Sequence, residues 1–312
     1  MIEIDWLIHY KCNYRCPYCF FEGYWEEVEK KNRYLPGREW TKTWEKMARR
    51  YGGLKLIITG GEPMIYPGFL DLVKGLSQFS AIAFDTNFSI SEDEVKKTAK
   101  SLDPGRFSIS LSFHPVFAKK ASFLKNALVL KKAGFDLLIH YVAWPPQLKK
   151  MTEAKKDFVS EGFRFVPIPF RGSYLGKNYP SSFTMEERAL IEGGLASPRS
   201  EDLNWTQSAL KMVKTAGRLC SAGQKYARVD SDGTVYLCGH DFTASDVKAV
   251  LGNVTDKDFR MNENPVLCRQ DWCPCEFRFL VEESRSKKVD GKREEKGDGS
   301  FFRRKKAKSR RI

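Results

Sequence analysis

Apolar, β-branched runs alternate with helical patterns between residues 3 and 168, and this alternation predicts strands and helices in turn. The predicted strands are Glu3–His9, Lys55–Thr59, Ala81–Asp85, Arg106–Ser112, Asp136–Val142 and Phe163–Ile168. The predicted helices between them are Glu39–Tyr51, Gly68–Gln78, Ser91–Lys100, Lys119–Ala133 and Met151–Ser160. Six β/α units of about 30 residues predict an α/β fold, a partial (β/α)6 TIM-like barrel with its helices outside.

The pattern changes after the sixth unit. Helices are predicted at Thr184–Glu192 and Asp202–Lys214, and "QKYARVDSDGTVYLCGH" predicts a hairpin that turns at Asp230–Gly233. We therefore expect four regions: the barrel at 1–195, a helical linker at 196–215, a small cysteine-rich α+β domain at 216–280, and a tail at 281–312.

Composition places the chain among ordinary globular proteins. Its 312 residues are 42% hydrophobic, which is enough for a large core. The sequence contains no run of eighteen apolar residues, so it predicts no membrane span. The N-terminus lacks the pattern of a secretory signal. We expect a cytoplasmic protein, in which clustered cysteines indicate metal or redox chemistry.

Half of the formal charge of +14 lies at one end of the chain. Residues 281–312 hold thirteen Lys and Arg against six Asp and Glu, a net charge of +7. Such a run favours a solvated, disordered tail. Binding to nucleic acid is the less favoured alternative, because no RNA-binding signature accompanies it.

Three of the eight cysteines form a C-x3-C-x2-C cluster in "HYKCNYRCPYC", directly after the first predicted strand: Cys12, Cys16 and Cys19. Zinc sites usually combine C-x2-C pairs into four ligands, so a zinc site is the less favoured alternative here. Three thiolates on one loop suit a cubane iron–sulfur cluster whose fourth iron stays open for another ligand.

This motif, with the aromatic Tyr18 before its last cysteine, resembles that of the radical S-adenosylmethionine (SAM) enzymes. The resemblance implies a [4Fe–4S] cluster whose open iron binds the amino and carboxylate groups of SAM. It also implies one-electron cleavage of SAM to methionine and a 5′-deoxyadenosyl radical, which takes hydrogen from a substrate. A reductase such as flavodoxin or ferredoxin is the implied electron donor.

Further matches follow the predicted strands. "TGGEP" after the second strand resembles the segment with which these enzymes hold the SAM amino group, and it offers Gly60, Gly61 and Glu62. Asn87 and Ser110 are candidates for the ribose and carboxylate of SAM, with ordinary strand-end hydrogen bonding as the alternative. Two further candidates, with incidental surface roles as their alternatives, are His114 and Arg171.

The second group of cysteines resembles the SPASM and twitch extensions of the same enzymes. Twelve residues separate Cys220 from Gly233, and four more separate Gly233 from Cys238. The resemblance implies one auxiliary [4Fe–4S] cluster in a twitch-type domain, with a structural zinc site as the alternative. Its expected ligands are Cys220, Cys238, Cys273 and Cys275, with Cys268 as a substitute.

The resemblance leaves the substrate open. We expect net oxidation, cross-linking or maturation of a peptide or small metabolite, with the auxiliary cluster as electron acceptor or substrate ligand. Modification of RNA or a nucleotide, with the basic tail as anchor, is one alternative. A non-catalytic iron–sulfur carrier is another, and "GGEP" argues against it. Aromatic residues near the strand ends could stack on a substrate or pack a lid: Phe20, Phe21, Tyr24, Trp25, Trp144, Tyr174 and Tyr179.

Overall fold

The structure, a computed structural model, describes residues 1–196, 199–239, 250–273 and 279–281. The chain from Met1 to Val281 forms one compact unit. Within the described ranges, no helix is both long and apolar enough to cross a lipid bilayer. The basic tail and Cys275 lie outside the described residues.

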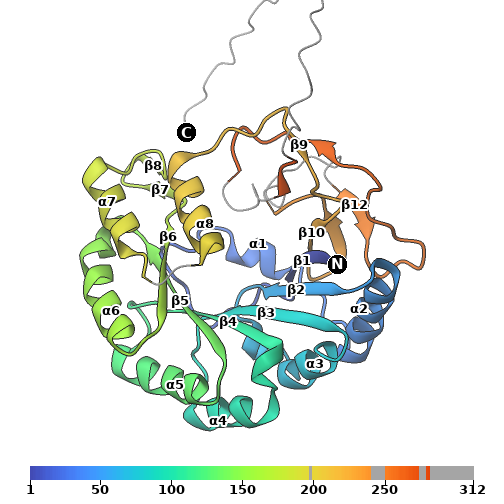
Figure 1. Cartoon of the computed structure of the whole chain (residues 1–312), viewed down its shortest axis with the longest axis horizontal. Coiled ribbons are helices and arrows are strands. Elements are labelled where there is room, and N and C mark those ends of the chain that lie inside the picture. The colour runs from blue at the N-terminus through green and yellow to red at the C-terminus, as the bar shows by residue number, and fades with distance from the viewer. Residues whose placement is uncertain (197–198, 240–249, 274–278, 282–312) are drawn as a thin grey trace, which may run out of the picture. The chain divides into compact units, whose positions relative to one another are not determined.

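A curved sheet of nine strands forms the centre of this unit, in the order β12-β11-β10-β1-β2-β3-β4-β5-β6 (Figure 1). Six strands confirm the predicted barrel, with ends that differ from the prediction by at most two residues. They are β1 (Ile2–Leu7), β2 (Leu54–Thr59), β3 (Ser80–Thr86), β4 (Phe107–Ser112), β5 (Asp136–Ala143) and β6 (Arg164–Pro169). All six are parallel, as crossover helices require.

Helices cover the outer face of the sheet (Figure 1). The predicted helices are confirmed as α2 (Gly37–Tyr51), α3 (Phe69–Leu76), α4 (Glu92–Ser101), α5 (Lys120–Lys132), α6 (Leu148–Ser160), α7 (Met185–Gly194) and α8 (Ser200–Lys211). Ser91 and Thr184 begin α4 and α7 with capping boxes. Packing fixes α2 against the sheet, because the buried Trp40 ring lies 4.7 Å from that of Trp6 on β1.

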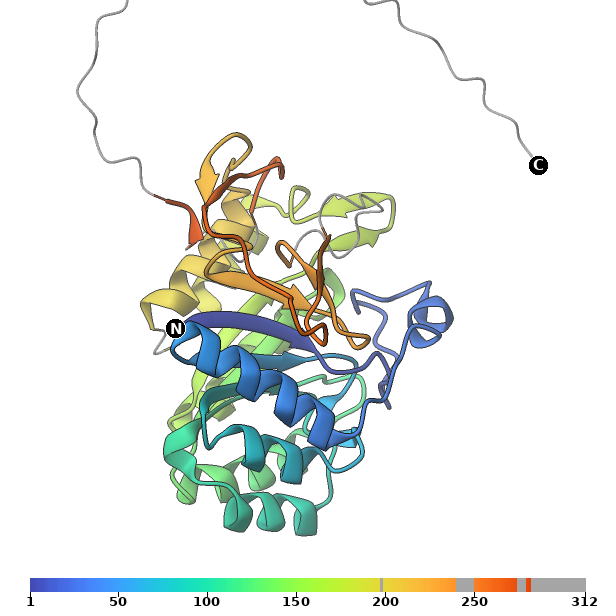
Figure 2. The ribbon, with the colours of Figure 1, turned by 90° about the vertical axis from the view of Figure 1, so that its right-hand side faces the viewer.

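Several elements were not predicted. A short helix α1 (Trp25–Glu29) follows the cysteine loop, beyond the carboxyl end of β1 (Figure 2). Two small pairs of strands were also missed: β7 (Gly172–Tyr174) with β8 (Lys177–Tyr179), and β9 (Leu219–Cys220) with β13 (Val266–Leu267).

The predicted C-terminal hairpin is present, and it continues the barrel sheet. Strands β10 (Tyr226–Val229) and β11 (Thr234–Tyr236) pair around the turn at residues 230–233, and β12 (Val250–Asn253) pairs with β11. β10 lies parallel to β1, with Arg228 opposite Asp5. The division into domains near residues 196–215 stays a prediction, and the sheet itself is continuous across that division.

A buried hydrogen bond joins the hairpin turn to the segment after β1. The Tyr10 hydroxyl donates to Asp230 Oδ2 at 2.6 Å, and both residues are buried. Tyr10→Phe leaves a buried carboxylate short of a donor, so we expect the free energy of unfolding to fall by about 1–3 kcal/mol. Urea unfolding measures this change. Tyr34→Phe, at a half-exposed ring, is the control, and an equal loss there would contradict the assignment.

Candidate functional site

One cavity of about 460 Å³ opens at the carboxyl ends of the strands, where chemistry is placed in barrels of this kind. The loop after β1 and the loop after β2 both face it. The cavity brings together the following predicted site residues: Cys12, Cys16, Tyr18, Cys19, Gly60, Gly61, Asn87, His114 and Arg171. The site therefore joins residues that lie up to 159 positions apart in the sequence, from Cys12 to Arg171.

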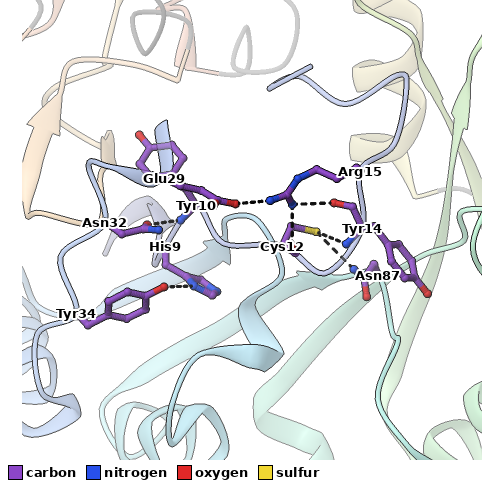
Figure 3. Close-up of polar contacts among 9 residues, drawn as sticks. All are labelled: His9, Tyr10, Cys12, Tyr14, Arg15, Glu29, Asn32, Tyr34 and Asn87. Atoms are coloured by element: carbon purple, nitrogen blue, oxygen red, sulfur yellow. Dashed lines mark hydrogen bonds and ion pairs between the residues drawn. The ribbon is translucent and has the colours of Figure 1, made fainter. Parts of the chain in front are cut away.

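The three thiols sit on a tight loop whose backbone approaches their sulfur atoms. The Tyr14 amide lies 3.4 Å from Cys12 Sγ, and the Phe21 amide lies 3.5 Å from Cys19 Sγ. The Asn87 side-chain amide lies 3.7 Å from Cys12 Sγ (Figure 3). Such N–H groups stabilise thiolate ligands and tune the potential of a bound cluster.

The thiols need a cation to ionise. Burial raises the pKa of Cys16 to about 12 and that of Cys19 to about 11, and the neighbouring thiols add to the shift at Cys16. At neutral pH these groups therefore stay protonated unless bound metal draws off their protons. In the described part of the chain, no three His, Cys, Asp or Glu side chains are grouped to hold a single metal ion. A cubane makes a different demand, because each of its cysteines binds a separate iron.

Arg15 braces this loop from inside the motif (Figure 3). Its guanidinium donates to the carbonyl oxygens of Cys12 at 2.7 Å and Tyr14 at 3.1 Å. It also pairs with Glu29 at 2.7 Å and lies 4.5 Å from the centre of the Trp25 ring. Arg15 thus ties the cysteine loop to α1, whose Trp25 lines the cavity.

Removing this brace should loosen the cysteine loop. We expect Arg15→Gln to lower the free energy of unfolding by about 1–3 kcal/mol and to reduce the iron retained after anaerobic reconstitution. The matched control is Arg49→Gln, because Arg49 pairs with Glu45 on the exposed face of α2 and should contribute at most about 0.5 kcal/mol. Equal losses in the two variants would refute the brace.

The glycine pair lets the loop after β2 pack against the cysteine loop. A Cβ on Gly60, where φ is +153°, would lie 2.4 Å from the His9 carbonyl oxygen. A Cβ on Gly61 would lie 2.1 Å from that of Lys11. Backbone bonds close the contact, from the Gly61 amide to His9 at 2.8 Å and from the Glu62 amide to Lys11 at 2.9 Å. The two glycines therefore allow close packing against the backbone just before Cys12, and they also line the cavity.

Glu62 points into the protein. Its carboxylate accepts hydrogen bonds from the Met64 amide at 2.9 Å, the Thr86 hydroxyl at 2.7 Å and the Asn87 amide at 2.6 Å. The side chain is buried, and burial raises its pKa to about 7 against the effect of these donors. Glu62 thus ties the end of β2 to the end of β3, and its pairing with the SAM amino group stays a prediction.

The remaining candidates divide between the cavity and the sheet. The Tyr18 hydroxyl lies 3.2 Å from His114 Nδ1, and their rings stack 5.7 Å apart. Ser110 instead lies opposite Asp85 in the sheet, and Ser112 is the β4 serine that lines the cavity. The role of Ser110 toward SAM stays a prediction.

Three charged residues that the sequence analysis missed also line the cavity: Asp5, Asp85 and Arg228. The sequence does contain a sign of them, because each is a charged residue within an otherwise apolar strand pattern, as in "EIDWLI" and "YARV". Arg228 was the hardest to find, since the pairing of β10 with β1 is what brings it to the cavity.

The second cysteine group is gathered in part. Cys220 is buried with Ala222 and Tyr226, and Cys238 and Cys268 pack against them. The amide of Ala222 lies 3.4 Å from Cys220 Sγ. The Cys273 amide donates to the Val213 carbonyl at 3.1 Å. Cys275 lies outside the described residues, so the ligand set of an auxiliary cluster stays a prediction.

Comparison with known proteins agrees with both cysteine groups. The Radical SAM superfamily model matches residues 6–156, and the SPASM model, an iron-sulfur cluster-binding domain, matches residues 220–288. GTP 3',8-cyclase from Haemophilus ducreyi is 26% identical over 263 residues, 73% of this chain and 74% of that protein. GTP 3',8-cyclase from Psychromonas ingrahamii is 25% identical over 292 residues, 79% of each chain.

Two further likenesses are shorter or more distant. An S-adenosylmethionine-dependent nucleotide dehydratase from a Thermoplasmatales archaeon is 38% identical over 90 residues, 28% of this chain and 29% of that protein. The solved structure "Native anSMEcpe with bound AdoMet" superposes with a TM-score of 0.55 at 20% identity, covering 81% of this chain and 78% of that one. This second likeness concerns the fold alone.

Proposed function

This chain belongs to the radical SAM superfamily and carries a SPASM domain, and from that premise we propose that it is an enzyme that modifies a nucleotide. The two family matches imply [4Fe–4S] clusters and SAM as its cofactors. A carrier without catalysis has no use for a cavity that joins the cysteine loop, the glycine pair and Asn87. The proposal rests on that shared cavity.

The chain's own residues fit these groups. Cys12, Cys16 and Cys19 would hold the cluster, and the glycine pair and Asn87 line the space beside it. When bound, the cluster and SAM supply a 5′-deoxyadenosyl radical for hydrogen abstraction. Arg15 braces the cysteine loop, and the rings of Phe21 and Trp25, whose centres lie 5.3 Å apart, line the cavity.

A nucleotide suits what remains of the cavity. Phe20 and Trp25 offer flat rings for stacking on a base, and Arg171 offers a guanidinium for a phosphate. The named relatives are nucleotide enzymes, which favours the nucleotide alternative of the sequence analysis over peptide maturation.

For the second cysteine group we propose one auxiliary [4Fe–4S] cluster. Cys220 is buried, and the partly buried Cys238 and Cys268 pack against the same cluster of side chains, which supports these three as ligands beside Cys273. Since Arg228 and the hairpin turn join this region to the barrel sheet, an auxiliary cluster here would lie in the same compact unit as the cavity. It would serve as electron acceptor or as a ligand of the substrate.

Anaerobic reconstitution tests the proposal. The protein is loaded with iron and sulfide, then given dithionite, SAM and a panel of nucleoside triphosphates, and 5′-deoxyadenosine is measured. We expect about eight irons per chain and nucleotide-stimulated formation of 5′-deoxyadenosine. Stimulation by a peptide panel and by no nucleotide would overturn the substrate class, and the absence of SAM binding would overturn the enzyme itself.

The basic tail gives a separate prediction. A single nucleotide binds in the cavity. We therefore expect removal of residues 289–312, the part of the basic tail beyond the SPASM match, to leave nucleotide-stimulated cleavage of SAM unchanged. If RNA were the substrate, the truncation would weaken RNA binding. Raising the salt from 50 to 200 mM would then lower the affinity of the full chain for RNA by about a thousandfold or more. Titrations of both chains at the two salt concentrations distinguish these cases.

A further inference from the structure

Charged side chains face the inner side of this curved sheet, whereas the interior of a closed (β/α)8 barrel is filled mainly by Val, Ile and Leu. Here Asp5 on β1, Asp85 on β3 and Arg228 on β10 project to the inner side of the curved sheet and line the cavity. We call these three residues the floor cluster, because each lies on a strand and not on the loops beyond it.

The floor cluster is held by neighbouring strands. Asp5 and Arg228 are opposite each other in the sheet and form an ion pair at 3.1 Å, with side chains only 18% and 12% exposed. The Thr59 hydroxyl donates to the other oxygen of Asp5 at 3.1 Å. Asp85 lies opposite Ser110 on β4. The ion pair and the Thr59 hydrogen bond hold Asp5 in place, and both carboxylates line the cavity.

Positive charge is scarce in this cluster. The floor cluster holds two carboxylates and one guanidinium, which pairs with Asp5, and removing charges from water costs several kcal/mol each unless other groups compensate. Burial raises the pKa of Asp85, and the nearby charge of Asp5 raises it further, against the opposing effect of His140. A ligand that supplies hydrogen-bond donors would therefore be stabilised at Asp85 and Asp5.

Resting on the proposed function, we propose that the floor cluster binds the edge of the substrate's base and selects it. The carboxylates of Asp85 and Asp5 accept hydrogen bonds from amino or imino N–H groups, and Arg228 donates to an adjacent carbonyl or ring nitrogen. Guanine carries both kinds of group side by side, so it fits this arrangement of acceptors and donor. The floor cluster is thus the specificity site of the cavity.

The test compares two nucleotides that differ by one group. Reconstituted protein with SAM is titrated with GTP and with inosine 5′-triphosphate, which lacks the exocyclic amino group. We expect the wild type to bind GTP more tightly by at least about tenfold. Asp85→Asn keeps the shape of the side chain and removes its charge, so we expect the affinity for GTP to fall at least about tenfold and the preference to disappear.

A matched control and a second readout separate recognition from folding. Glu3 faces the same side of β1 one layer below Asp5, pairs with Lys55 at 3.0 Å and lies outside the cavity lining, so Glu3→Gln should bind GTP as the wild type does. Asp85→Asn should retain SAM binding and should melt at the same or a higher temperature, because a buried charge has been removed.

The outcomes are distinct. If the wild type binds neither nucleotide, the nucleotide function fails and the floor proposal fails with it. If the wild type binds both nucleotides equally, or if Asp85→Asn keeps the tenfold preference for GTP, the floor proposal is overturned and the nucleotide function stands. Even if the variant does not fold, equal binding of GTP and its inosine analogue by the wild type would overturn the floor proposal.

Discussion

Cys16→Ala is expected to abolish formation of 5′-deoxyadenosine. Cys16 is the most buried of the three cavity thiols, and its loss leaves two ligands for a cluster that the loop holds with three. Changes around metal ligands cost about 10- to 100-fold in activity or affinity, and loss of a ligand should exceed that range. Chromatography of the reaction products measures the activity, and iron content should fall by about four atoms per chain.

Ser77→Ala is a suitable control, because Ser77 is similarly buried but belongs to the end of α3, outside the cavity lining. It should retain iron and activity. A Cys16→Ala protein that kept its full iron content and cleaved SAM would show that the cluster is not held by this loop.

Gly61→Ala is expected to have the second largest effect. The added Cβ would stand 2.1 Å from the Lys11 carbonyl oxygen, and this neighbour is backbone, so relief requires the cysteine loop to move. We expect the free energy of unfolding to fall by about 3 kcal/mol, the upper end for overpacking, and cluster loading to fail at the same time. Urea unfolding and iron analysis measure the two effects.

Gly193→Ala is the matched glycine control. Gly193 lies in α7 with no neighbouring atom near an added Cβ, so alanine there should stabilise the protein by about 0.5–1 kcal/mol. A Gly61→Ala variant as stable as wild type, with a full cluster, would mean that the two loops can separate without consequence.

Much of the barrel followed from local patterns. Alternating buried positions in β2 and β4, together with the capping box at Ser91, are properties of a few adjacent residues, and they marked the elements correctly. The cysteine spacing is equally local. It needs no tertiary information to place three thiols on one loop after β1.

The missed features depend on pairing between distant segments. Nothing in the residues around Arg228 shows that β10 lies beside β1, because a parallel neighbour 223 residues away leaves no local pattern. Likewise, the sequence analysis assigned the two glycines to SAM binding, and the structure shows that they also give space to the carbonyl groups of His9 and Lys11. Short α1 escaped detection because five residues show less than two helical turns of periodicity.

The pairing of β10 with β1 also limits how this protein can be divided. A fragment that ended before the hairpin would leave β1 as an open edge, with a row of unpaired amide and carbonyl groups available to other chains. It would also leave the Asp5 carboxylate without Arg228 and the Tyr10 hydroxyl without Asp230. The barrel and the hairpin are therefore a single unit for expression and engineering, and neither can be exchanged as an independent module.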